Sequence, residues 1–177
     1  KINGVSFVGS RDPADQEHVD AIKAIHADYA AVMPFGFIRE LGSPEIIFDT
    51  DRQWYGETRE GARQYIDLLH RNGVRVMLKP QLWIWRGVFT GELEMQSEED
   101  WKQLEAEYAD FILSFAELAE ETQAALFCIG TELESFVMAR PEFWDNLISE
   151  VRARYSGRIT YAANWDEYGR FPLWSRL

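Results

Sequence analysis

The sequence has 177 residues, of which 46% are hydrophobic, and this is enough for one domain with a substantial core. Its 30 acidic and 18 basic residues give a formal net charge of -12, which argues against nucleic acids and anionic membrane surfaces as partners, because both are bound through Lys and Arg. A single cysteine, Cys128, excludes an intrachain disulfide and a Cys-based metal site, and no stretch approaches the roughly 20 apolar residues of a membrane span.

Short β-rich segments alternate with amphipathic segments along the whole chain. In chain order, the patterns predict a strand at 4–9, a helix at 15–27, a strand at 28–35, a helix at 58–73, a strand at 74–81, a helix from about Ser97, a strand at 125–130, a helix at 141–157 and a strand at 158–164. The first helix would carry Val19, Ile22 and His26 on one face. Ser97 is the expected N-cap of the long helix, and Gly73 is the expected end of the helix before it.

Unbroken β–α alternation predicts a parallel sheet, either an open doubly wound sheet or a (β/α)8 barrel. The five strands begin about 39 residues apart on average, and eight such units need roughly 310 residues, which is typical of a barrel. No Pro- or Ser-rich linker divides the chain. We therefore expect one α/β domain over residues 1–177, the N-terminal part of a (β/α)8 TIM barrel with only about the first five βα units.

The alternation of side chains within two strands also favours the barrel. In the fourth predicted strand, strict alternation places Cys128, Gly130 and Glu132 on an inner face and larger residues on the opposite face. In the third, it points Lys79 and Gln81 inward and aliphatic residues outward. A doubly wound sheet meets helices on both faces, and its strands tend to be apolar on both.

The active site of an α/β barrel lies at the C-terminal ends of its strands. Those ends carry Ser10, Arg11, Pro34, Phe35, Lys79, Gln81, Trp83, Trp85, Glu132, Glu134, Asn164, Trp165 and Asp166. All three histidines fall in helical segments instead, which disfavours a His-rich metallohydrolase and a Ser-His-Asp hydrolase. No Gly-rich phosphate loop is present. These observations predict carboxylate acid–base chemistry on a neutral, hydroxyl-rich ligand, without a metal or a cofactor.

Three stretches, VMLKPQLWIW, FCIGTELESF and ITYAANWDEY, resemble in their order and spacing the clan A glycoside hydrolases. More narrowly they are similar to family 113, the β-mannanase-type barrels and their bacterial relatives. The similarity runs over essentially all 177 residues, and IGTEL is its most specific element. Thr131 stands where most clan A enzymes have Asn, as the family 113 pattern allows.

The resemblance implies retaining hydrolysis of β-linked, mannose-type glycans with a general acid/base Glu at the end of the fourth strand, here Glu132. It also implies a nucleophilic Glu at the end of a seventh strand, downstream of this chain, so the isolated 177-residue chain is expected to be inactive. Glycoside cleavage requires two such carboxylates. A structural carboxylate bonded to Lys79 or to a backbone amide is the alternative for Glu132.

Six further residues are candidates to bind a carbohydrate. Indole rings stack on the C–H faces of sugars, and amide, amine and carboxylate groups bond their hydroxyls. The candidates are Lys79, Gln81, Trp83, Asn164, Trp165 and Asp166. Asn164 shares its predicted face with small residues and should point inward, whereas Trp165 should pack along the rim.

Two other functions remain open at the level of sequence. One is a catalytically silent carbohydrate-binding barrel that keeps the tryptophans and Glu132. The other is an aldolase or lyase in which Lys79 forms a Schiff base. Secretion or a cell-surface location is expected only by analogy with polysaccharide-degrading proteins, and the edges of an incomplete barrel could mediate association.

Overall fold

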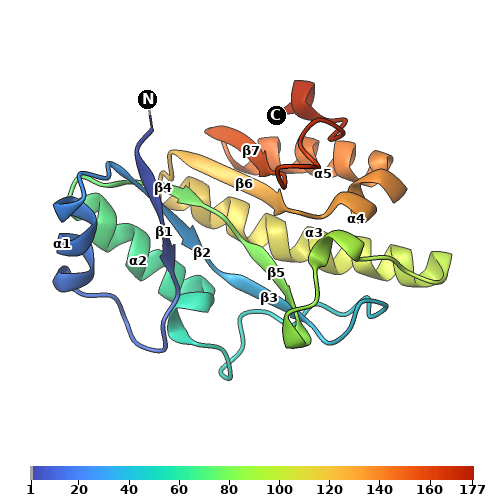
Figure 1. Ribbon diagram of the computed structural model, residues 1–177, viewed down its shortest axis with the longest axis horizontal. Coiled ribbons are helices and arrows are strands. Elements are labelled where there is room, and N and C mark those ends of the chain that lie inside the picture. Colours follow the sequence, from blue (N-terminus) through green and yellow to red (C-terminus); the bar gives the residue numbers. More distant parts are fainter. Residues whose placement is uncertain (1) are drawn as a thin grey trace.

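Five parallel strands of the computed structural model, which describes residues 2–177, lie side by side in the order in which they occur along the chain (Figure 1). They are β1 (Gly4–Val8), β2 (Tyr29–Met33), β4 (Arg75–Leu78), β6 (Leu126–Thr131) and β7 (Arg158–Ala162). The helices are α1 (Gln16–Ala24), α2 (Arg59–Arg71), α3 (Glu98–Glu121), α4 (Glu134–Ala139) and α5 (Pro141–Arg154). Each strand therefore adds next to its predecessor, as in a barrel, whereas a doubly wound sheet reverses its order.

The two faces of the sheet differ in burial. One row of register partners crosses it through Val32, Leu78, Phe127 and Ile159, and all four are buried. Helices α2, α3 and α5 lie along this face (Figure 1). The neighbouring row leads from Met77 through Leu126 to Arg158 and is half-buried or exposed. One covered face and one open face are what the first five units of a (β/α)8 barrel present, and the predicted fold is confirmed.

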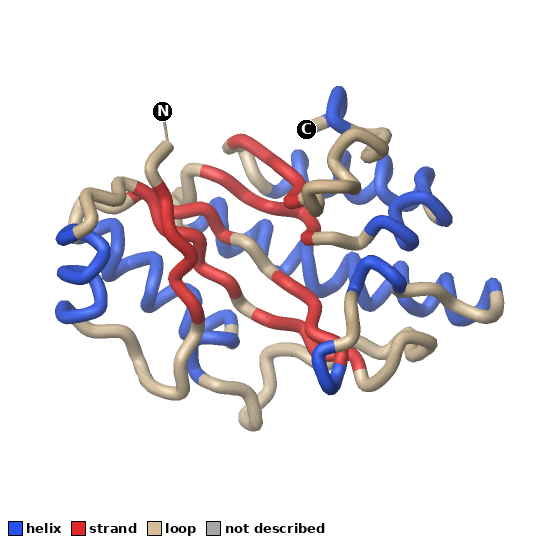
Figure 2. The backbone as a smooth tube through the Cα atoms, viewed as in Figure 1, coloured by secondary structure: helices blue, strands red, loops and turns tan. Residues whose placement is uncertain are grey.

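Two short strands prolong β2 and β4 beyond their predicted ends (Figure 2). β3 (Phe35–Ile38) follows β2 after Pro34, β5 (Gln81–Ile84) follows β4 after Lys79 and Pro80, and the two pair in parallel. The prolines lack an N–H, which interrupts the ladder without ending the path of the strand. The prediction that the third strand ends at Gln81 was therefore wrong.

A β-bulge interrupts β6 near its end. Cys128 pairs with Thr160, but Thr131 pairs with Ala162, so β6 contains one extra residue. The expectation that Gly130 continues the inner face of Cys128 was wrong. A Cβ at Gly130 would lie 2.8 Å from Trp144 of α5, so this position faces the helices.

Helix boundaries follow local capping. Ser97 Oγ accepts the Asp100 N–H, as predicted for the N-cap of α3, and Gly73 follows α2 with a positive φ of 74°. Helix α1 ends at Ala24, so His26 lies beyond it, exposed and with a φ of 58°, and the prediction that His26 shares the helix face was wrong. The six-residue helix α4 was not predicted, because its sequence ESFVMA follows a strand with no capping side chain.

Aromatic side chains fill the core between α3, α4 and α5. Tyr108 and Trp144 have ring centroids 5.3 Å apart, and Phe136 packs edge-on against both at 5.4–5.5 Å. Trp144 is fully buried and Trp101 nearly so. This cluster lies directly behind the bulge of β6 and fixes its position.

Candidate active site

Glu132 follows the last residue of β6 and adopts a left-handed backbone conformation, with a φ of 51°. Such a conformation is unfavourable for a residue with a side chain and persists where neighbouring contacts impose it. Its N–H donates to Ala162 O at 2.9 Å, and its carbonyl accepts from Thr90 Oγ1 at 3.2 Å. The strain and its supports make the end of β6 the first candidate for a functional site.

A cavity of about 370 Å³ opens beside Glu132. It is lined from β5 and the segment before it by Lys79, Gln81 and Trp83, so the structure brings together four of the seven predicted site residues. Its other lining residues are Phe35, Leu82, Ile84, Gly87, Val88, Phe89, Thr90 and Thr131. A carboxylate, an amine and an amide beside an indole give the cavity groups that can bind a polyhydroxylated ligand.

The other three predicted residues lie in the turn after β7 and do not line this cavity. Asn164 Oδ1 accepts the Trp165 N–H at 2.7 Å, so its side-chain oxygen forms a hydrogen bond within the turn. Trp165 is 85% exposed rather than packed along the rim, which corrects that expectation. Asp166 is exposed as well.

Sequence reasoning missed several polar residues around Glu132. Tyr161 Oη accepts the Leu133 N–H and donates to Glu167, each at 2.6 Å. Thr131 Oγ1 is buried in the cavity wall without a hydrogen-bond partner among residues 2–177. Strand parity could have placed Tyr161 on the helix side of β7, but nothing in the sequence joins it to the end of β6.

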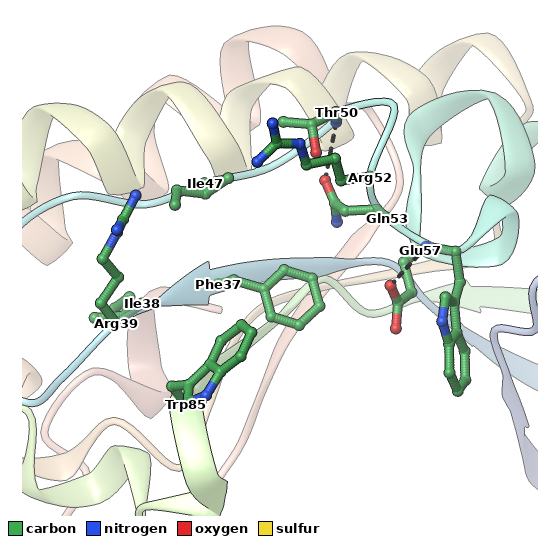
Figure 3. A pocket seen from close by; sticks show the side chains of 10 residues that line it. Phe37, Ile38, Arg39, Ile47, Thr50, Arg52, Gln53, Glu57 and Trp85 are labelled. Carbon is green, nitrogen blue, oxygen red and sulfur yellow. Dashed lines mark hydrogen bonds between the residues drawn. The ribbon is translucent and has the colours of Figure 1, made fainter.

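A larger cavity, of about 760 Å³, lies beyond the outer end of β3 and β5. Phe37 and Trp85 lie on one side of it, and Thr50, Arg52 and Gln53 lie on the other (Figure 3). Its remaining lining residues are Ile38, Arg39, Ile47, Trp54 and Glu57. Phe35 and Phe37 share the inner face of β3, with ring centroids 6.2 Å apart, so one aromatic wall connects the two cavities.

Glu57 is the carboxyl group of the larger cavity. It accepts the Trp54 N–H at 3.1 Å, a contact drawn in Figure 3, and burial raises its pKa above the ordinary value of 4.5. The opposite wall is tied to the strand by Gln53, which accepts the Thr50 N–H and donates to Phe35 O. This cavity therefore combines exposed aromatic rings with polar groups on a separate loop.

Two other reactive groups near β6 are accounted for by their contacts. Burial raises the pKa of the Cys128 thiol, which donates to Gly130 O, so Cys128 is a packing residue. Glu134 begins α4 and forms a bidentate ion pair with Arg170 at 2.5 and 2.8 Å. Because this ion pair engages both carboxylate oxygens, Glu134 is not a candidate for acid–base chemistry at the cavity.

Two wider features of residues 2–177 bear on function. No group of three or more His, Cys, Asp or Glu side chains in this part of the chain is arranged to hold a metal ion. Likewise, none of its helices is both long enough and apolar enough to cross a membrane.

Comparisons with known proteins identify the family. The sequence profile of Glycoside Hydrolase Family 113 matches residues 9–177. A family 113 β-mannanase of Alicyclobacillus acidocaldarius, solved in complex with ManMIm, superimposes with a TM-score of 0.86 at 22% identity, over 99% of this chain and 58% of the mannanase. Two structures of a family 113 β-1,4-mannanase, one of them a complex, superimpose with TM-scores of 0.85 and 0.86 at 21% identity, over 99% of this chain and 60% of theirs. No curated protein matches the sequence.

The solved structures confirm the fold and show how much of it this chain contains. At 21–22% identity their likeness is a likeness of fold, and this chain spans 58–60% of their length. The profile match, in contrast, rests on the sequence and covers nearly all of it. The chain thus belongs to glycoside hydrolase family 113.

Proposed function

We propose that this chain is the N-terminal part of a retaining glycoside hydrolase that cleaves β-linked, mannan-type oligo- or polysaccharides, with Glu132 as the general acid/base. The observation that carries the proposal is the position of Glu132 at a strand end, beside a cavity lined by Lys79, Gln81 and Trp83. Membership in family 113 and the β-mannanases among the similar structures support the substrate class.

In the proposed mechanism, the protonated Glu132 carboxyl donates its proton to the glycosidic oxygen as the bond to the sugar breaks. A second carboxylate attacks the sugar from the opposite face and forms a covalent intermediate. Glu132, now ionised, then removes a proton from the water that hydrolyses this intermediate. We expect the second carboxylate from the part of the barrel that the similar structures contain and this chain does not span.

The substrate is proposed to lie along the aromatic wall. Trp83 is 48% exposed and offers its indole face to a sugar ring near Glu132, with Lys79 and Gln81 as hydroxyl partners. The larger cavity around Phe37 and Trp85 accommodates further sugar residues of the same glycan. Asn164, Trp165 and Asp166 are proposed to contact the ligand from the opposite side of the barrel mouth.

A chain limited to residues 1–177 is proposed to be inactive and prone to associate. Its inner sheet face is only partly covered, and β1 and β7 are sheet edges with unpaired backbone groups. Sedimentation velocity on this chain should show oligomers. A monodisperse monomer that unfolds cooperatively would contradict the expectation.

The test of the proposed function is Glu132→Gln in the complete barrel protein. Loss of the proton donor should lower the hydrolysis of mannan-type oligosaccharides by about 10²- to 10⁴-fold. The glycosylation step on activated aryl mannosides should fall far less, because a good leaving group departs without protonation. Glu134→Gln is the matched control, since this nearby carboxylate is paired with Arg170, and it should change neither rate.

Three outcomes would contradict the proposal. An equal loss on both kinds of substrate would make Glu132 a structural carboxylate. Tight binding of manno-oligosaccharides by a complete barrel that hydrolyses none of them would indicate a silent binding protein. Trapping of a carbonyl compound on Lys79 by borohydride would indicate a Schiff-base enzyme.

A further inference from the structure

The peptide bond between Glu132 and Leu133 is held at both of its polar ends. Its carbonyl accepts from Thr90 Oγ1 at 3.2 Å, and its N–H donates to Tyr161 Oη at 2.6 Å. The preceding peptide is held as well, through the Glu132 N–H and Ala162 O. Because two fixed peptide planes flank the Glu132 Cα, they determine its backbone torsions and hence the direction of its side chain.

No side chain or amide among residues 2–177 donates a hydrogen bond to the Glu132 carboxylate itself. The orientation of this carboxylate therefore depends on the backbone that carries it. That backbone is in the left-handed conformation, at a φ of 51°, which it would leave if the flanking bonds were lost.

In the hydrogen bonds that link Leu133, Tyr161 and Glu167, each donor and acceptor is fixed. An amide N–H can only donate, so Tyr161 Oη must accept from Leu133 and must point its own proton elsewhere. Tyr161 Oη donates this proton in a hydrogen bond to Glu167 Oε1, 2.6 Å away, and Glu167 Oε2 accepts the Asn164 N–H at 2.9 Å. Burial, and then the bond to Glu167, raises the pKa of Tyr161 far above its usual value, so its proton is retained.

Glu167 is an acidic side chain in a buried position. It is only 2% exposed, and it takes part in no ion pair among residues 2–177. A buried carboxylate without a cationic partner is costly, even when both oxygens are hydrogen-bonded as they are here. A carboxylate acceptor also strengthens the bond that Tyr161 makes to Leu133, since linked hydrogen bonds polarise one another.

We infer that Tyr161 and Glu167 are positioning residues for Glu132, and that the chain of bonds from Glu167 through Tyr161 to the Leu133 N–H holds the acid/base carboxylate in its reactive orientation. This inference rests on the proposed role of Glu132. It assigns to the turn after β7 a function at the end of β6 besides any contact with the ligand. Proton transfer to the glycosidic oxygen depends steeply on such alignment.

Tyr161→Phe in the complete barrel protein is the first test. The ring keeps its stack on Phe171, at a centroid distance of 4.2 Å, so the variant should fold. We expect kcat on unactivated manno-oligosaccharides to fall about 10- to 100-fold, with little change in KM. On activated aryl mannosides the loss in the glycosylation step should be much smaller, since that step does not need the proton.

Tyr155→Phe is the matched control. Tyr155 is also a buried tyrosine with a 2.6 Å hydrogen bond to the backbone, which it donates to the carbonyl of Ala124, just before β6 begins. It should lower the melting temperature about as much as Tyr161→Phe and leave kcat unchanged. An equal loss of kcat in both variants would mean that general destabilisation is responsible, and would overturn the inference.

A double-mutant cycle separates this inference from the proposed function. If Tyr161 acts through Glu132, the pair Glu132→Gln and Tyr161→Phe should be no slower than Glu132→Gln alone. Multiplied losses would overturn the inference, as would an unchanged kcat in Tyr161→Phe when Glu132→Gln is severely impaired. Full activity of Glu132→Gln would instead refute the proposed function, whatever the result for Tyr161.

Discussion

The end of β6 and the larger cavity beyond β3 and β5 differ in the burial of their aromatic rings. At the end of β6, a strained Glu132 is fixed by three backbone hydrogen bonds and backed by the buried rings of Tyr108, Trp144 and Tyr161. At the larger cavity, Trp85 is 65% exposed and Trp54 is 46% exposed. The loop that carries Thr50 and Gln53 is joined to β3 by two backbone hydrogen bonds between Phe37 and Ile47 and by the bond from Gln53 to Phe35 O.

This contrast matches two different demands of the proposed glycosidase activity. Proton transfer requires a carboxylate within a fraction of an ångström of its target, and a rigid, close-packed frame provides this. Binding of a long glycan requires a wide surface, which exposed aromatic rings can provide. Substitutions at the end of β6 should therefore affect stability and rate, whereas substitutions at the rim should affect the use of long substrates.

The largest expected effect on stability comes from filling the space at Gly130. A Cβ there would lie 2.8 Å from Trp144, 3.0 Å from Tyr161 and 3.1 Å from Tyr108, all rigid and buried rings. Gly130→Ala should therefore lower the free energy of unfolding by about 1–3 kcal/mol, as overpacking does in other cores. Urea denaturation of the complete barrel protein measures this loss.

Gly42→Ala provides the control for that change, since no atom lies within 4 Å of the added Cβ. Its stability should stay within about 0.5 kcal/mol of the parent or rise slightly, through the reduced entropy of the unfolded chain. If Gly130→Ala were equally mild, the end of β6 would be more adaptable than its contacts indicate, and the contrast with the rim would be lost.

A smaller effect, on binding alone, is expected at the rim. Trp85→Ala removes an exposed ring of the larger cavity, so it should leave the free energy of unfolding nearly unchanged. Loss of one stacking contact should cost about 1 kcal/mol, or roughly fivefold in KM, for long manno-oligosaccharides. Steady-state kinetics on substrates of increasing length should show the penalty only for those long enough to reach the cavity.

Tyr168→Ala is the comparison for Trp85→Ala, because Tyr168 is an aromatic residue of the same 65% exposure outside both cavities. It should not change KM at any substrate length. A loss of kcat on the shortest substrates in Trp85→Ala would show instead that the rim contributes to the alignment of Glu132.

The smallest effect concerns the protonation of Glu57. Burial raises its pKa in the folded protein above the ordinary value of 4.5, so its contribution to stability is complete below that value and is lost as the pH rises through the folded pKa. Glu57→Gln has no titratable group, so it does not lose stability as the pH rises, and it keeps an oxygen that can accept the Trp54 N–H. The variant should therefore melt higher than the parent at pH 7 and equally at pH 4. The same difference at both pH values would rule out titration of Glu57 as its cause.

Much of the architecture could be predicted from the sequence, because it depends on local patterns. Alternating β-rich and amphipathic segments predicted the order of strands and helices, and Ser97 and Gly73 marked helix ends through capping that involves only neighbouring residues. The inward direction of Lys79 and Gln81 followed from alternation along a regular strand, and both line the cavity beside Glu132.

The same reasoning failed wherever a distant contact overrides local geometry. Strict alternation misplaced Gly130, because the bulge in β6 depends on rings of α3, α5 and β7 that pack against it. The predicted strands at 28–35 and 74–81 missed the continuation into β3 and β5, because these two short strands are stabilised by pairing with each other across more than 40 residues of chain.

The sequence by itself determined the repeating strand–helix units, the family motifs and the position of Glu132 at the end of a strand, since each depends on residues close together in the chain. Only the tertiary structure decided how Glu132 is held. Its supports are Thr90, Ala162 and Tyr161, which lie 29 or more residues away in the sequence, and Glu167 acts through one of them. Hydrogen bonds of this kind leave no periodic pattern, because they form only when folding brings the ends of neighbouring strands together.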